Sequence, residues 1–116
     1  MELSDNLPDI YETFIRHDIR IGVILSAMVS KMARKPAYKL EIDFGPFGKL
    51  HSSAQITALY TPESLVGKKI LAVINLPPLQ VAGTRSECLV LGAINPAGEV
   101  VLLTPDPEAV AGDPVR

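Results

Sequence analysis

The sequence predicts an all-β fold in which several short strands form a small barrel or sandwich. Apolar and polar residues alternate with a period of two in several runs, and turn signals rich in glycine and proline separate these runs. One short helical motif interrupts the strands near the middle of the chain. At 116 residues the chain is the size of one domain and is long enough to bury its own core.

The first predicted element is a short helix in DIYETFIRH, within an N-terminal extension that covers residues 1–17. Asp9, with Glu12 three residues later, resembles a capping box, and Ile10 and Phe14 share one helical face. A helix this short has little stability alone. We therefore expect its apolar face to pack against the barrel or against a second subunit.

Three strands are predicted next, at the start of a domain that covers residues 18–116. In DIRIGVILSAM the residues expected to share one face are Ile19, Ile21, Val23 and Leu25. A basic loop, MVSKMARKP, leads to AYKLEIDFG, where the apolar residues Tyr38, Leu40, Ile42 and Phe44 alternate with charged ones. The turn GPFG then precedes a third strand, KLHSSAQI.

TPESLVG has the pattern of a helix of one or two turns, with Thr61 as the cap, Pro62 in the first turn and Gly67 as the stop. The strand KKILAVINL follows, and then the β-rich runs SECLVLGAI and GEVVLLTP, which the turn NPAG joins into an extra hairpin. The tail DPEAVAGDPVR should be extended. This order matches a five-stranded oligonucleotide-binding (OB) barrel, which has a short helix between its third and fourth strands.

The composition indicates an intracellular globular protein. A single cysteine, Cys88, cannot form an internal disulfide, and it lies in an apolar run typical of a buried position. The N-terminus lacks the pattern of a signal peptide, and the apolar runs are shorter than the ~18 residues of a membrane span. We therefore expect a cytoplasmic protein without membrane insertion.

Charge is unevenly distributed along the chain. The formal net charge is −2, with −4 over residues 1–18, +6 over residues 19–85 and −4 over residues 86–116. A basic middle segment can create a positive face on an acidic protein, and a scattered, solvated surface is the alternative.

The segments AYKLEIDFG, HSSAQI, YTPESLVGKKILAVINLPP and VAGTRSECLVLGA, in this order, resemble the tRNA-binding-domain family. This family occurs free or appended to aminoacyl-tRNA synthetases. The short length and the ending GEVVLLTPD resemble the CsaA-type bacterial chaperones in particular, and the similarity covers about residues 18–106. The resemblance implies an OB barrel, a homodimer, and binding of tRNA, of unfolded or preprotein chains, or of both.

One segment departs from the family pattern. Its asparagine-leucine segment is commonly followed by a proline and two basic residues, whereas this chain reads NLPPLQ, with Leu79 and Gln80 in the basic positions. Each lost phosphate contact weakens electrostatic binding to nucleic acid. The substitution leaves a more apolar rim, which suits a peptide ligand.

The candidate RNA-binding residues fall into two groups. Cations of the basic loop and the next strand are candidates for phosphate contacts, and polar residues at strand ends are candidates for reading a base or ribose. Structural roles are the alternative for both groups: a solvated loop, or hydrogen bonds that hold the barrel closed. The candidates are Lys31, Arg34, Lys35, Lys39, Ser53, Gln55, Asn75, Arg85 and Ser86.

Aromatic stacking of bases is a further possibility at Tyr38, Phe44 and Tyr60, although alternation favours core packing for the first two. The isolated His17 and His51 predict no metal site, and no cofactor motif is present. No nucleophile elbow surrounds Ser53 or Ser86, so catalysis is not expected.

Three functions remain open at this point. The first is binding of tRNA or another structured RNA, and the second is an export-related chaperone that captures extended apolar peptides in a groove near a dimer interface. The third is a structural or regulatory dimer with neither activity. For the peptide groove and the dimer contact, the candidates are Ile10, Phe14, Leu76, Leu79 and Val81.

Overall fold

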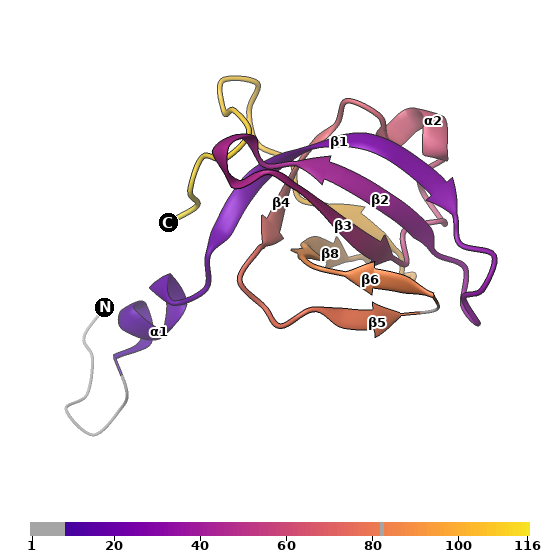
Figure 1. Ribbon diagram of the computed structural model, residues 1–116, viewed down its shortest axis with the longest axis horizontal. Helices are drawn as coiled ribbons and strands as arrows, with labels where there is room; N and C mark the ends of the chain where they lie inside the picture. Colours follow the sequence, from indigo (N-terminus) through magenta and orange to yellow (C-terminus); the bar gives the residue numbers. More distant parts are fainter. Residues whose placement is uncertain (1–8, 82) are drawn as a thin grey trace.

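A computed structural model describes residues 9–81 and 83–116 and shows a curved antiparallel sheet that wraps into a barrel (Figure 1). The sheet has five strands in the order β3-β2-β1-β4-β7. These strands are β1 (Ile19–Val29), β2 (Tyr38–Asp43), β3 (Lys49–Ala54), β4 (Lys69–Val73) and β7 (Leu89–Val90).

The two edges of this sheet approach each other and nearly close the barrel. The Glu87 N–H donates to the His51 carbonyl (2.8 Å), and the His51 N–H donates to Oε1 of Glu87 (2.9 Å). The Ser52 hydroxyl donates to the Cys88 carbonyl at 3.0 Å. The predicted five-stranded OB barrel is confirmed.

Alternation along β2 explains the barrel core. Tyr38, Leu40, Ile42 and Phe44 are all buried, with exposed fractions from 0% to 6%. Full burial of one large apolar side chain contributes about 1.5–3 kcal/mol to the free energy of unfolding. This strand is therefore a major source of stability. The prediction that these residues face the interior, rather than stack on bases, is confirmed.

The predicted apolar face of β1 is not the face that lines the barrel core. Ile19 and Ile21 are buried but lie outside the main core cluster, and Leu25 is 36% exposed. Gly22 and the fully buried Ile24 lie on the face toward the core, where Ile24 pairs with Ile42. The pairing register between β1 and β2 shifts only beyond Ile24, between Ile24 and Ser26, where one strand carries an extra residue.

The short helix α2 (Pro62–Leu65) lies between β3 and β4, as predicted. The Thr61 hydroxyl accepts from the Ser64 N–H (3.2 Å), and the Ser64 hydroxyl accepts from the Thr61 N–H (3.0 Å), so a reciprocal capping box begins the helix. Gly67 ends it with a φ of +86°, a value that favours glycine. Leu65 is fully buried and anchors the helix in the core.

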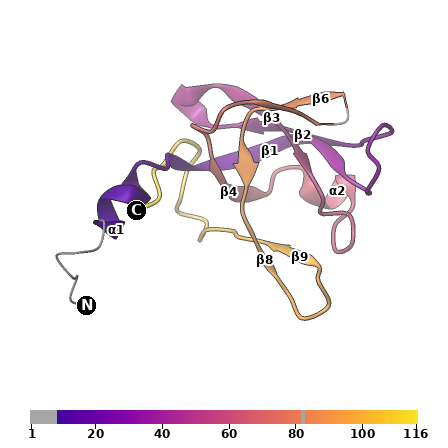
Figure 2. The same ribbon diagram turned by 90° about the horizontal axis from the view of Figure 1, so that it is seen from below.

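Two hairpins extend the barrel. The predicted C-terminal hairpin is confirmed as β8 (Gly92–Ile94) and β9 (Val100–Leu102), which projects from the barrel in Figure 2. The run SECLVLGAI is not one strand, because Leu91 bonds back to Leu71 and the chain then leaves β4 to pair with β9. A hairpin that the sequence did not predict consists of β5 (Leu79–Val81) and β6 (Thr84–Ser86).

The two ends of the described chain meet near the start of β1. The helix α1 (Ile10–Ile15) stands apart from the barrel (Figure 1), and the Asp9 side chain accepts from the Glu12 N–H at its first turn. The C-terminal tail is not extended throughout, because bonds from the Ala109 N–H to Asp106 and from the Asp113 N–H to Val110 close two turns in it. It pairs with β1 through bonds from the Gly112 N–H to Ile21 and from the Val115 N–H to Ile19, both 2.8 Å. Residues 1–8 of the predicted extension lie outside the described residues.

Candidate nucleic-acid interface

The loop between β1 and β2 and the end of β3 enclose the basic groove, a depression of about 430 Å³. The loop supplies two exposed cations, Arg34 and Lys35, and β3 supplies Ser53 with Gln55 just beyond it. In Figure 1 this loop extends past the arrowhead of β1, at the end of the barrel far from α1. The full lining is Met32, Ala33, Arg34, Lys35, Ala37, Ser53 and Gln55.

The cations of this loop have no acidic partner among the described residues. The ion pairs within residues 9–81 and 83–116 instead involve Arg20, His51 and Arg85. Lys31, next to the groove, is also exposed and unpaired within that part of the chain. The loop therefore presents positive charge that no carboxylate of the described residues neutralises, as a phosphate-binding surface requires.

The polar side chains near the β3–β7 seam, where the two edges of the sheet meet, differ in whether their hydrogen-bonding groups are already used. The Ser52 hydroxyl donates to the Cys88 carbonyl, and the Ser86 hydroxyl accepts from the Ser53 N–H and donates to Cys88, both at 3.4 Å. By contrast, the Ser53 hydroxyl and the Gln55 amide make no hydrogen bond to any described residue. Ser86 thus helps to close the barrel, and Ser53 and Gln55 keep free donors and acceptors at the groove.

Beside the groove, the outer face of the sheet carries mixed charges. Lys39 lines a second depression of about 190 Å³ with Glu41 and His51. The His51 ring lies 3.5 Å from Glu41 and 3.2 Å from Glu87, and Arg85, 68% exposed, is 3.9 Å from Glu87. The hydrogen bond from the backbone N–H of His51 is the main cause of the lowered pKa of Glu87, because it stabilises the ionised carboxylate.

Asn75 lies far from the basic loop. Its amide accepts from the Asp18 N–H (2.9 Å) and donates to the Arg16 carbonyl (2.7 Å), just before β1 begins. The basic loop follows the other end of β1, an 11-residue strand that spans about 33–36 Å if straight. The structure therefore does not bring Asn75 together with the loop cations, and both ends of its amide hold backbone in place.

Tyr60 also serves the barrel. Its hydroxyl accepts from the Leu102 N–H (2.9 Å), and its carbonyl accepts from the Tyr38 hydroxyl (2.7 Å). These bonds link α2, β2 and β9. Because Tyr38 and Phe44 are buried, the described face near the basic groove offers no aromatic stacking platform from these three residues.

A mainly apolar groove of about 180 Å³ lies near the β4–β5 connection. Leu76, Leu79 and Leu89 line it and are 37%, 65% and 51% exposed. The backbone of Val81 ends β5, but its side chain lies outside what the structure describes. The other predicted contact residues, Ile10 and Phe14, are 57% and 40% exposed on the separate helix α1.

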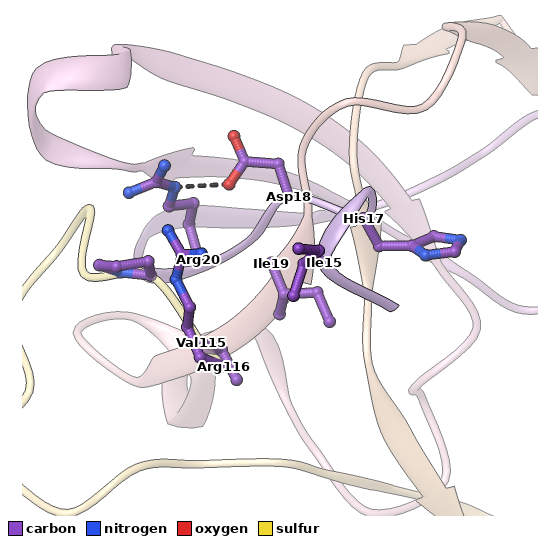
Figure 3. Close-up of a pocket in the computed structure, with 8 residues that line it drawn as sticks. Ile15, His17, Asp18, Ile19, Arg20, Val115 and Arg116 are labelled. Atoms are coloured by element: carbon purple, nitrogen blue, oxygen red, sulfur yellow. Dashed lines mark hydrogen bonds and ion pairs between the residues drawn. The ribbon is translucent and has the colours of Figure 1, made fainter. Parts of the chain in front are cut away.

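A fourth depression, of about 250 Å³, lies where α1, β1 and the C-terminal tail meet (Figure 3). Arg20 bonds Asp18 at 2.6 Å and the Gly112 carbonyl at 3.1 Å, and its guanidinium lies 4.2 Å from the centre of the Phe47 ring. Figure 3 shows the His17 ring pointing away from the Arg20–Asp18 pair. Arg20 is thus already used to hold the tail against β1.

Within the described residues, no cluster of three or more histidine, cysteine or acidic side chains is placed to hold a metal ion. Cys88 is buried, and desolvation raises the pKa of its thiol to about 12. No helix in the same part of the chain is long and apolar enough to cross a membrane.

Comparison with known proteins gives a consistent family. The family model described as "Putative tRNA binding domain" matches residues 19–114. The methionine–tRNA ligase of Methanosarcina mazei is 34% identical over 97% of this chain, and that of Methanocaldococcus jannaschii is 37% identical over 85%. The chain spans only 16% and 15% of these ligases.

Solved structures match over nearly the whole chain. The chaperone CsaA of Bacillus anthracis is 47% identical, with a TM-score of 0.86, and covers 99% of this chain and 100% of its own. The CsaA chaperone of Picrophilus torridus is 50% identical, with a TM-score of 0.86, over 91% of this chain and 97% of its own. A protein from Pyrococcus horikoshii described as related to methionyl-tRNA synthetase is 29% identical, with a TM-score of 0.83, over the full length of both chains.

Proposed function

Because this chain belongs to the tRNA-binding-domain family, we propose that it is a non-enzymatic protein that binds tRNA or another structured RNA through the basic groove. The observation that carries this proposal is the loop of Lys31, Arg34 and Lys35, whose cations have no acidic partner among the described residues. We also propose a cytoplasmic location, which tRNA binding would favour.

The proposed contacts divide by chemistry. Loop and strand cations bind phosphates, and free polar groups at the groove bind base or sugar. Asn75 and Ser86 act indirectly, because their hydrogen bonds hold the start of β1 and the β3–β7 seam. The proposed direct contacts are Lys31, Arg34, Lys35, Lys39, Ser53, Gln55 and Arg85.

A salt titration of tRNA binding tests this proposal. The variant Lys31→Ala/Arg34→Ala/Lys35→Ala removes three cations at the groove, and Arg16→Ala/Lys49→Ala/Arg116→Ala removes three exposed cations elsewhere. Because each phosphate contact contributes about 0.7–0.9 to the slope of log K against log salt, the first variant should flatten the slope by about 2. Equal slopes for both variants, or no saturable binding of bulk tRNA by the unmodified chain at low salt, would refute the proposal.

We also propose that the protein is a homodimer. The helix α1 has six residues, and its Ile10, Phe14 and Ile15 are 40–57% exposed, so it gains little stability from its own chain. The β8–β9 hairpin likewise exposes Ile94 (67%) and Val101 (38%). A second copy that covers these faces would bury apolar area that is now in water. Light scattering that finds a monomer at micromolar concentration would contradict this proposal.

Binding of extended apolar peptides is the second candidate function. The apolar groove of Leu76, Leu79 and Leu89 favours it, and so does the similarity to proteins described as chaperones. Unfolded or preprotein chains would be the ligands. A peptide array tests the idea, because binding should concentrate on apolar peptides. Leu79→Asp should weaken this binding. Leu59→Asp, at an exposed leucine that does not line the groove, is the control. Equal binding of polar and apolar peptides would exclude it.

A further inference from the structure

We propose that Met32 is a reversible oxidation site, at which peroxide converts the thioether to a sulfoxide and releases the β1–β2 loop from the neighbouring hairpin. The oxidation and the release of the loop are independent of any ligand. Only the expected effect on RNA affinity rests on the proposed function. Three features of Met32 support the inference: its exposure, its contact outside its own loop, and its place in the basic groove.

Both methionines among the described residues are exposed, although methionine is one of the residues most often buried in proteins. Met32, in the β1–β2 loop, is 71% exposed, and Met28, near the end of β1, is 64% exposed. Oxidation depends on access of the oxidant to the sulfur. Cys88 is protected by contrast, because it is buried and its raised thiol pKa of about 12 keeps it protonated. Peroxide should therefore reach the methionines first.

The end of the Met32 side chain contacts the β5–β6 hairpin. Its Sδ would lie 3.0 Å and its Cε 3.8 Å from a Cβ placed at Gly83, in the turn between β5 and β6. Figures 1 and 2 both place this hairpin and the β1–β2 loop at the same end of the barrel. The loop itself is closed at its base by the bond from the Ser30 N–H to the Ala37 carbonyl (2.9 Å). Met32 lies between these two residues and connects the loop to a second hairpin.

Oxidation would change this contact. Hydrogen peroxide transfers one oxygen atom to the sulfur, so that an S–O bond forms, the O–O bond breaks, the sulfur loses two electrons and water is released. The product is polar and chiral, and it disrupts apolar contacts. Because the new oxygen is attached to the atom that lies against Gly83, the sulfoxide must leave the turn for water. Sulfoxide reductases can restore the thioether.

Release of Met32 would affect the basic groove. Arg34 and Lys35 follow Met32 in the same loop and line the same groove. A loop without its contact to the hairpin must be ordered again when a ligand binds, and this should weaken tRNA binding by about two- to tenfold. Oxidation leaves the number of cations unchanged, so the slope of log K against log salt should stay the same.

Peroxide treatment of the full chain tests the inference. Mass spectrometry of peptides measures the oxidation rate at each methionine, and hydrogen exchange measures the opening of the β1–β2 loop and of the turn at Gly83. Met32 should oxidise about as fast in the folded chain as in urea, and exchange at both places should then rise. Affinity for bulk tRNA should fall by about two- to tenfold, and treatment with both types of sulfoxide reductase should restore it.

Two leucine variants show which methionine is responsible. Met32→Leu keeps a side chain of similar volume that peroxide does not oxidise, so treatment should leave its exchange and its tRNA affinity unchanged. Met28→Leu is the matched control, because it removes an equally exposed methionine whose backbone pairs with Lys39 of β2. Treated Met28→Leu should still show the full effect. An equal loss of affinity in Met32→Leu and the unmodified chain, or slow oxidation of Met32 in the folded chain, would overturn the inference.

The outcomes also separate this inference from the proposed function. If tRNA binds with the expected salt slope but oxidation of Met32 changes neither exchange nor affinity, the inference alone fails. If tRNA does not bind at all, the proposed function fails, and the exchange of the β1–β2 loop before and after oxidation still decides whether Met32 holds it.

Discussion

Gly22 in β1 is a position where the structure and the usual preferences of strands predict opposite effects of a substitution. A Cβ placed there would lie 2.5 Å from Cγ2 of Ile42 and 2.6 Å from Cε1 of Phe44, and both side chains are fully buried. Carbon atoms normally pack at about 3.5–4.0 Å, so Gly22→Ala requires a shift of about 1 Å in the core. Such overpacking costs about 1–3 kcal/mol.

The backbone effect has the opposite sign. Glycine inside a strand is less favourable than alanine by about 0.5–1 kcal/mol, because glycine loses more conformational freedom on folding. The two effects leave a net destabilisation of about 1 kcal/mol for Gly22→Ala. For a domain of 116 residues this corresponds to a fall of about 4 °C in the melting temperature.

Urea unfolding at a fixed protein concentration measures this difference. Far-UV circular dichroism is suitable, as is tyrosine fluorescence, because the chain has no tryptophan. Ile42→Ala removes one of the two contacting atoms, so the Gly22→Ala/Ile42→Ala double variant should lose less free energy of unfolding than the sum of the single variants. A Gly22→Ala protein as stable as the unmodified chain, or more stable, would refute the packing argument.

Three further predictions follow from single contacts. Cys88, with a thiol pKa of about 12, should react with a disulfide reagent near pH 8 on the order of a thousandfold more slowly in the folded than in the unfolded chain, and comparable rates would contradict its burial. The lowered pKa of Glu87 means that its carboxylate stabilises the fold at neutral pH and that this contribution is lost as the pH falls through the lowered value. Glu87→Gln should therefore lose less stability in acid than the unmodified chain, as urea midpoints at about pH 7 and about pH 3 would show. Asn75→Ala removes the bonds to Asp18 and Arg16 and should cost about 1–2 kcal/mol in the free energy of unfolding, and an unchanged urea midpoint would exclude the structural role.

Elements that depend on neighbouring residues could be predicted from the sequence. The alternation from Tyr38 to Phe44 predicted the buried face of β2, and the cap at Thr61 and the stop at Gly67 predicted α2. The loop cations were also evident, because a run of basic residues in a loop requires no knowledge of the fold. These features follow from side-chain periodicity and from local backbone preferences.

Features that depend on pairing between distant strands could not be predicted in the same way. Leu25 is exposed at a register shift against β2, and the hairpin of β5 and β6 has strands of only three residues. Periodicity gives no signal for a bulge, and runs of three residues are too short to show alternation.

The site shows the same division. The sequence by itself determined the strands β1 to β4, the short helix α2, the family resemblance and the residue types available for RNA binding. Only the tertiary structure decided which polar groups are already used: Asn75 bonds a residue 57 positions away, and Ser86 bonds a strand 33 positions away. Ser53 and Gln55 keep free groups beside Arg34 and Lys35 because β3 ends next to the loop. Availability for a ligand depends on which partners folding brings within hydrogen-bonding distance, and that depends on the whole chain.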